Sequence, residues 1–169
     1  MADMDKETAF KKLYDEYRNR IYRMCCYYVS SEEDRKDLYQ EVFFNLWKGL
    51  ENFRGDSALS TWAYRVTVNS ALSYLARAKS RKKTSTAYHQ FVLTQHQPAG
   101  QDSDDGAIDL LHGAIIKLPL IDMIIVSLVL EGASTKEIAR TTGLTESNVR
   151  VRIHRSKQRM RRLIEGEKP

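Results

Sequence analysis

Apolar side chains recur every three or four residues along most of the chain, which is the period of an amphipathic α-helix. This pattern predicts helices over about 8–28, 34–50 and 59–79. Ser31 precedes the second of these segments and is followed three residues later by Asp34, a spacing typical of a helix N-cap. The alternation of apolar and polar residues that marks a β-strand is not found in the sequence. The chain is therefore predicted to be all-α.

The helical pattern is interrupted over 84–107, where Ser, Thr, Gln, Gly and Asp accumulate and the apolar period is lost. We interpret this segment as a flexible linker. Beyond it, a strongly apolar helix is expected over about 121–130. The sequence thus predicts two small helical domains, 1–83 and 108–169, joined by the linker.

The second domain carries the spacing of a helix-turn-helix. Ser134 and Glu137 stand at the two positions of a capping box, which predicts the start of a short helix. Gly143 is expected to end that helix, and Thr145 is a suitable N-cap for a longer helix that begins at Glu146. We expect this longer helix to be the one that enters DNA.

One side of the longer helix is polar and positively charged, and no Asp or Glu occurs between Ser147 and Ile164. In a major groove, Arg can pair with guanine, Asn with adenine, and a valine methyl with the thymine methyl. The alternative is a merely solvated helix face, but the one-sided charge favours binding to duplex DNA. The face carries Ser147, Val151, His154, Arg155, Gln158 and Arg162, flanked by Asn148, Arg150 and Arg161.

A second basic segment contains no Asp or Glu at all over 57–101, within a chain of net charge +5. Aromatic rings, cations and amides are interleaved in it and in the turn before it, as binding of unpaired bases requires. Trp62 and Tyr64 could instead belong to the core, and for Trp62 the two roles can coexist. The residues concerned are Phe53, Arg54, Trp62, Tyr64, Arg65, Asn69, Arg77, Lys79, Arg81, Lys82 and Lys83.

The predicted helix over 34–50 places one phenylalanine, Phe44, on its polar side, among Asp37, Gln40 and Glu41. An exposed aromatic ring surrounded by carboxylates and an amide is typical of a binding hot spot for a basic protein. The periodicity leaves an alternative open, in which another part of the chain covers Phe44.

Several classes of protein are excluded. The longest apolar stretch, 118–130, is shorter than the roughly 20 residues that a bilayer span needs, and the N-terminus lacks the apolar run of a signal peptide. Cys25 and Cys26 are adjacent, so they are expected to be reduced core thiols in a cytoplasmic protein. His89 and His96 lie in the linker, and we expect neither a metal site nor a catalytic set. Membrane insertion and enzymatic activity are therefore not expected.

Several of these motifs, taken in order, resemble those of bacterial sigma factors of the extracytoplasmic-function (ECF) group. The resemblance covers about 8–83 and 108–163, with the family's variable linker between them. The motifs are Asp37–Phe43, Trp47, Phe53–Ser57, Ser60–Asn69, Leu118–Pro119, Glu131–Ser134, Glu137–Ala139 and Val149–Arg155.

The resemblance implies a subunit that binds core RNA polymerase, at the clamp helices of the largest subunit and at the flap, and directs promoter-specific initiation. It implies that polymerase is bound by Asp37, Gln40, Glu41 and Phe44. The minus-ten element, with a flipped base, would be bound by Phe53, Arg54, Ser60, Thr61, Trp62, Arg65, Asn69 and Arg77. The duplex minus-thirty-five element would be bound by Ser147, Asn148, Arg150, Val151, Arg152, His154 and Arg155.

The resemblance also implies an anti-sigma partner and no cofactor. The chain departs from the family in the apolar character of 120–130, which implies either a thicker core or a surface for an inhibitor. The alternative function is a stand-alone helix-turn-helix repressor or activator, which would dimerise on a two-fold operator.

Overall fold

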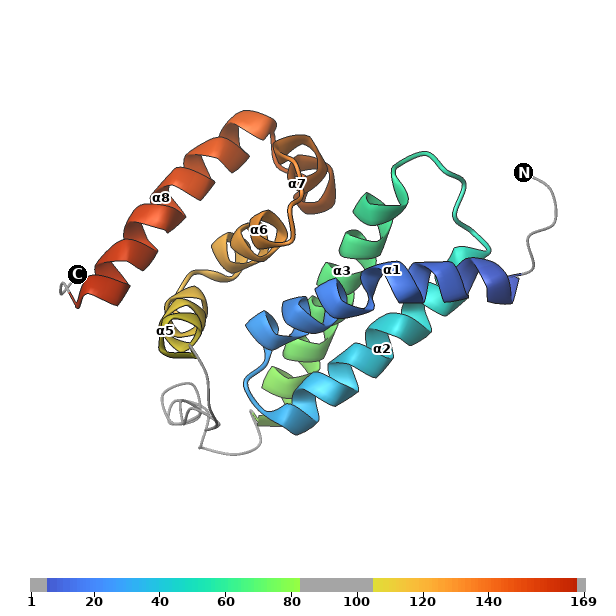
Figure 1. Ribbon diagram of the computed structural model, residues 1–169, viewed down its shortest axis with the longest axis horizontal. Helices are drawn as coiled ribbons and strands as arrows, with labels where there is room; N and C mark the ends of the chain where they lie inside the picture. Colours follow the sequence, from blue (N-terminus) through green and yellow to red (C-terminus); the bar gives the residue numbers. More distant parts are fainter. Residues whose placement is uncertain (1–5, 83–104, 167–169) are drawn as a thin grey trace. The chain divides into compact units, whose positions relative to one another are not determined.

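The computed structural model describes residues 6–82 and 105–166, and every regular element in these two ranges is a helix (Figure 1). The chain divides into two compact units, Met1–Arg81 and Lys82–Pro169. The prediction of an all-α protein with two small helical domains is confirmed. The helices are α1 (Lys6–Tyr28), α2 (Glu32–Leu50), α3 (Leu59–Lys82), α5 (Asp105–Ile115), α6 (Leu120–Leu130), α7 (Thr135–Thr142) and α8 (Glu146–Glu165).

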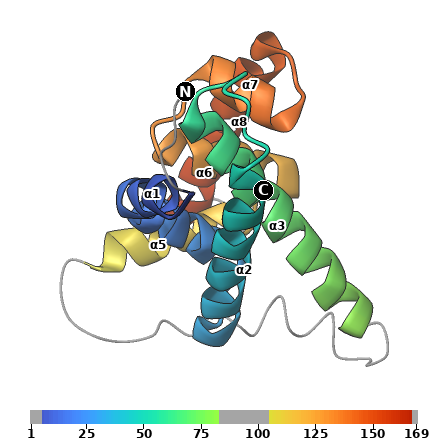
Figure 2. The same ribbon diagram turned by 90° about the vertical axis from the view of Figure 1, so that its right-hand side faces the viewer.

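In the first unit, α1, α2 and α3 pack around one core (Figures 1 and 2). An aromatic cluster joins α1 to α2, because the ring of Phe43 lies 4.9 Å from that of Tyr14 and 6.1 Å from that of Phe10. Because this packing buries one side of α2 against α1, the opposite side of α2 stays exposed to water. The buried apolar residues include Leu13, Ile21, Met24, Leu38, Val42, Leu46, Ala63, Tyr64, Val68 and Ala71.

The helix boundaries in this unit follow local signals. Ser31 is the N-cap of α2, and its hydroxyl accepts a hydrogen bond from the backbone N–H of Asp34 at 3.0 Å. The turn before α3 contains Gly55 with φ of +76°, a left-handed conformation that glycine adopts without strain. α3 continues to Lys82, slightly beyond the predicted end.

In the second unit, α8 packs along α5, α6 and α7. The core of the second unit includes Ile115, Ile125, Leu128, Ile138 and Val149. All of α6 from Met123 to Leu128 is buried, which supports the thicker-core interpretation, while Leu120 and Leu130 at its ends stay exposed.

The caps of the helix-turn-helix are those predicted. The backbone N–H of Ser134 donates to the Glu137 carboxylate at 2.8 Å, and the Glu137 N–H donates to the Ser134 hydroxyl at 3.3 Å. Gly143 has φ of +75° and its N–H donates to the Ala139 carbonyl, so α7 stops there. Thr145 caps α8 by accepting from the N–H of Asn148.

The predicted linker, 84–107, needs one correction at its end. Residues 105–107 form the first turn of α5, and the rest of the predicted linker lies outside the described residues. Asp and Gly are typical of turns, but Asp is also favoured in the first turn of a helix, so composition alone predicts this boundary incorrectly.

Candidate polymerase and nucleic-acid interfaces

Phe44 lies on the outer side of α2 with 55% of its surface exposed. The Nζ of Lys48 stands 4.3 Å from the centre of its ring, and Asp37 and Gln40 are exposed on the same helix. Glu41 is half-buried. Within the described part of the first unit, 6–82, the ring therefore stays largely exposed, with the Lys48 ammonium near it.

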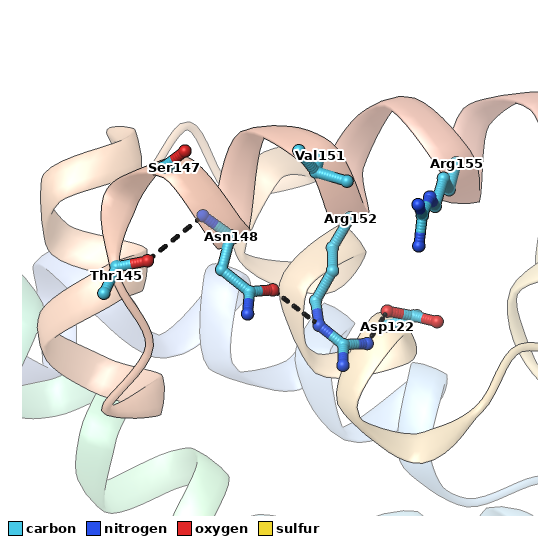
Figure 3. Close-up of a pocket in the computed structure, with 7 residues that line it drawn as sticks. All are labelled: Asp122, Thr145, Ser147, Asn148, Val151, Arg152 and Arg155. Carbon is cyan, nitrogen blue, oxygen red and sulfur yellow. Dashed lines mark hydrogen bonds and ion pairs between the residues drawn. The ribbon is translucent and has the colours of Figure 1, made fainter.

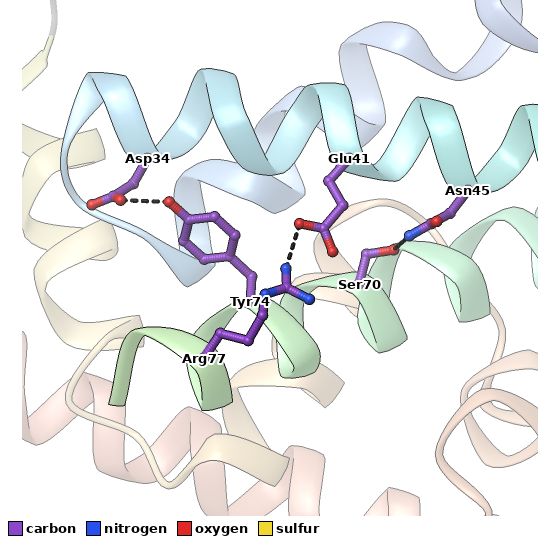
Figure 4. Close-up of polar contacts among 6 residues, drawn as sticks. All are labelled: Asp34, Glu41, Asn45, Ser70, Tyr74 and Arg77. Atoms are coloured by element: carbon purple, nitrogen blue, oxygen red, sulfur yellow. Dashed lines mark hydrogen bonds and ion pairs between the residues drawn. The ribbon is translucent and has the colours of Figure 1, made fainter. Parts of the chain in front are cut away.

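Polar contacts connect α2 to α3, and Figure 4 shows three of them. The Tyr74 hydroxyl donates to the Asp34 carboxylate at 2.5 Å, and the Asn45 amide donates to the Ser70 hydroxyl at 2.9 Å. Between them, an Arg77 guanidinium nitrogen donates to the Glu41 carboxylate. Glu41 thus faces α3 as well as the surface of α2.

The turn before α3 brings two rings together. Phe53 and Trp62 have ring centres 5.2 Å apart and planes tilted by 43°, and both side chains are half-buried. The indole also lies close to α2, because a Cβ built on Gly49 would be 3.0 Å from a Trp62 ring carbon. Trp62 therefore has one side packed against the unit and keeps part of its surface accessible.

The other residues expected at the minus-ten element differ in accessibility. Arg54, Arg65, Asn69 and Arg77 are exposed, and Ser60 is half-buried. Thr61 is only 1% exposed, so its expected contact with DNA is corrected: its side chain belongs to the core.

Tyr64 also belongs to the core and cannot offer a ring face to a base. It is 2% exposed, its ring packs edge-on against Tyr17, and Arg20 donates to its hydroxyl at 3.3 Å. Of the two aromatic residues in this part of α3, only Trp62 keeps access to the surface.

On α8, the face predicted to read DNA is the exposed one. Ser147, Asn148, Arg150, Val151, His154 and Arg155 are exposed, and Val151 alone presents an apolar surface there. Val149 and Ser156 are buried on the opposite side, against the rest of the unit.

Arg152 is placed differently from the other arginines of α8. It lines a hollow of about 510 Å³ beside α6, together with Asp122, Thr145, Ser147, Asn148, Val151 and Arg155 (Figure 3). Its Nη1 donates to the Asp122 carboxylate at 2.7 Å, and its Nε donates to the Asn148 Oδ1 at 3.0 Å. Asp122 is a functional residue that the sequence motifs do not predict, and the signal that points to it is its position as the one carboxylate in the apolar segment 120–130.

The two thiols are placed as core residues. Cys25 is buried and Cys26 half-buried, and neither forms a disulfide. Burial raises the pKa of the Cys25 thiol to about 12 and also raises the pKa of Cys26. Within residues 6–82 and 105–166, no group of His, Cys, Asp and Glu could hold a metal ion, and no helix is long and apolar enough to cross a membrane. His89 and His96 lie outside these ranges.

Known proteins match both units. The family model of sigma-70 region 2 matches residues 13–81, and that of sigma-70 region 4 matches residues 108–160. The ECF sigma factor SigM of Mycobacterium tuberculosis is 28% identical over 157 residues, covering 92% of this chain and 77% of SigM. The ECF sigma-E factor of Escherichia coli K12 is 29% identical over 163 residues, covering 90% of this chain and 84% of that factor.

Two solved structures share the fold. One is the sigma factor RpoE in complex with the anti-sigma factor NepR from Bartonella quintana, with a TM-score of 0.76 at 16% identity over 95% of this chain and 99% of RpoE. The other is CnrH in complex with the cytosolic domain of CnrY, with a TM-score of 0.69 at 20% identity over 96% of this chain and 91% of CnrH. With regions 2 and 4 both matched, and in that order, the chain belongs to the ECF group of RNA polymerase sigma factors, which direct transcription initiation.

Proposed function

We propose that the two units of this sigma factor divide promoter recognition between them. The first unit binds core polymerase through α2 and captures an unpaired base of the minus-ten element. The second unit reads the duplex minus-thirty-five element through α8. The observation that carries the proposal is the exposed face of α8, which presents cations, amides and one apolar residue from a capped helix-turn-helix.

The docking surface on α2 is centred on Phe44. A ring that is largely exposed in the free protein loses unfavourable contact with water when a partner covers it. Aromatic residues at the centre of an interface commonly contribute about 2 kcal/mol or more to binding. Asp37, Gln40 and Glu41 lie on α2 within two turns of the ring, and two of them are carboxylates, which favours a basic partner surface such as the one we propose on the clamp helices of the largest polymerase subunit.

Base capture falls to the Phe53–Trp62 pair and the polar residues beside it. Taking a base out of the duplex stack costs a few kcal/mol. Stacking of a base on an aromatic side chain gives back about 1–3 kcal/mol. Arg54 and Arg65 supply positive charge for the backbone, and Asn69 can bond a base edge. Preferential binding of the open strand thereby drives melting.

Upstream recognition falls to α8. Its exposed arginines neutralise phosphates and set the register on the duplex, while side chains toward its N-terminal end reach base edges. Each unit by itself has a small DNA surface, so the isolated protein is expected to bind promoters weakly. Attachment to polymerase presents both units to the same DNA.

Three further parts of the proposal follow the family. The chain has no catalytic role of its own, since polymerase makes the phosphodiester bonds, and it works in the cytoplasm with polymerase. An anti-sigma factor is proposed as its inhibitor, since both structural relatives named above are bound to partners and RpoE's is an anti-sigma factor.

A retention assay tests the proposal. Purified core polymerase and this protein are incubated with sheared DNA from the chromosome that encodes it, and retained fragments are sequenced after permanganate treatment. We expect selected fragments with unpaired thymines only when both proteins are present. Tight, sequence-selective retention by this protein alone, as a stable dimer on palindromes, would instead support the stand-alone regulator.

A further inference from the structure

The side chain of Asn148 is held in one orientation on the DNA-facing side of α8. Its Oδ1 accepts a hydrogen bond from the Nε of Arg152 at 3.0 Å (Figure 3). A guanidinium carries only donors, so the amide oxygen, and not the amide nitrogen, must face Arg152. The Asn148 NH₂ group is consequently directed away from Arg152, toward the hollow.

Arg152 is itself fixed from a different helix. Its Nη1 donates at 2.7 Å to Asp122 on α6, and the two side chains are only 34% and 19% exposed. A partly buried pair of this kind holds a guanidinium more firmly than an exposed pair does. The orientation of the Asn148 amide therefore depends on Arg152, and the position of Arg152 depends on Asp122.

This arrangement changes which base Asn148 can read. Recognition of adenine by asparagine uses two bonds, one accepted by Oδ1 from the adenine N6 and one donated to N7. Here Oδ1 already accepts from a cation, and the positive charge of Arg152 disfavours a second donor nearby. Only the NH₂ donors remain suited to a base, and guanine offers two acceptors, N7 and O6, in the major groove.

We propose that Asn148, positioned by Arg152 and Asp122, selects guanine over adenine at one position of the upstream element. This inference rests on the proposed function of α8 and differs from the expectation, drawn from residue type, that Asn pairs with adenine. Asn148 is the specificity-determining residue, and Asp122 is a positioning residue that acts through Arg152 without touching DNA.

The test uses the full chain with core polymerase and a promoter library randomised over the upstream element, with bound DNA sequenced. Wild-type protein is expected to enrich guanine at one position. Asn148→Asp keeps an oxygen for Arg152 but removes the donors, so guanine enrichment there should fall about tenfold. Asn19→Asp makes the same change of amide to carboxylate at an exposed position of α1, in the first unit, and should leave every base preference of the upstream element unchanged.

Asp122→Ala gives the readout that separates positioning from mere stability. With Arg152 released, Asn148 can turn and accept from adenine, so adenine should rise about tenfold relative to guanine at that position while the other positions keep their preferences. Because Asp122 lies in the first turn of α6, Arg152→Lys is tested beside it. Because a lysine ammonium lacks the planar, forked donors with which the guanidinium bonds both Asp122 and Asn148, the same shift toward adenine is expected.

Three results would overturn the inference. The first is enrichment of adenine by the wild type at the position that Asn148→Asp changes. The second is a uniform loss of affinity in Asn148→Asp, which marks a phosphate contact, and the third is unchanged base preferences in Asp122→Ala and Arg152→Lys. A wild-type library without any enriched position would overturn the proposed upstream reading itself, which distinguishes the two failures.

Discussion

Arg77 on α3 and Glu41 on α2 form an ion pair, with a guanidinium nitrogen and a carboxylate oxygen 2.5 Å apart. Arg77 is expected to bind DNA, and Glu41 is expected to bind polymerase. The ion pair therefore joins one residue of each proposed interface. The two side chains are 52% and 27% exposed, and pairs of this kind contribute at most about 1 kcal/mol. Either binding partner can therefore displace the pair at small cost.

The first prediction concerns this pair. Glu41→Gln and Arg77→Gln, measured singly and together by urea unfolding, should show a coupling free energy below about 1 kcal/mol. Polymerase affinity should fall in Glu41→Gln, because the carboxylate is lost from the docking surface. A coupling free energy well above 2 kcal/mol would mean that the ion pair stabilises the fold strongly and that neither Glu41 nor Arg77 can leave it at small cost.

The second prediction concerns Phe44. Phe44→Ala should weaken capture of core polymerase about 30-fold, the effect of losing a hot spot of about 2 kcal/mol, and leave the unfolding midpoint nearly unchanged. Tyr22→Ala is the control, because Tyr22 is also an exposed aromatic residue of the first unit but lies on α1. Equal capture by the wild type and Phe44→Ala, in a binding titration with immobilised polymerase, would remove Phe44 from the interface.

The third prediction concerns Gly49. Alanine there favours the helix by about 1 kcal/mol, but its Cβ would stand 3.0 Å from a ring carbon of Trp62 and push the indole. We expect Gly49→Ala to reduce promoter melting several-fold, as read by permanganate reactivity, with polymerase capture retained.

Gly113→Ala serves as the matched control, since Gly113 is also helical and a Cβ there meets nothing within 4 Å. The displacement of Trp62 can be followed by fluorescence in a Trp47→Phe background. If Gly49→Ala shifts the fluorescence and melting proceeds as in the wild type, Trp62 has no part in base capture.

The fourth prediction concerns pH. Burial raises the pKa of Cys25 from 9.0 to about 12, so between these values the unfolded chain has lost a proton that the folded chain keeps. The free energy of unfolding should therefore be unaffected below pH 9 and fall as the pH rises toward 12. Tyr17 acts in the same direction, because burial, followed by its bond to Glu16, raises its pKa from 10.0 to about 12.

Urea unfolding at pH 7.5 and pH 10.5 measures this dependence. Cys25→Ala should lower the free energy of unfolding at pH 7.5, by removing a buried side chain, but should lessen its decrease between the two pH values. Tyr17→Phe should lessen that decrease as well. A decrease of the same size in wild type and Cys25→Ala would contradict the assignment.

The sequence was sufficient for the helices, since their signals are local. The Ser134–Glu137 box and the caps at Ser31 and Thr145 each depend on residues three apart, and all of them form as predicted. The predicted end of the linker is wrong because Asp is common both in turns and at the start of a helix.

The sites could be predicted only in part, because their remaining features depend on tertiary packing. Periodicity placed Phe44 on the polar side of its helix but left open whether another segment covers it. It also could not decide that Tyr64 is buried while Trp62 keeps access to the surface. The contacts of Arg77 with Glu41 and of Arg152 with Asp122 join residues on different helices, and no local pattern reports them.

The most direct measurement maps the 5′ ends of RNA made on chromosomal DNA by core polymerase, with and without this protein. The proposed division between the two units predicts new start points that share two separated blocks of sequence, all of them lost with Phe44→Ala. An identical set of start points in the presence and absence of the protein would contradict it.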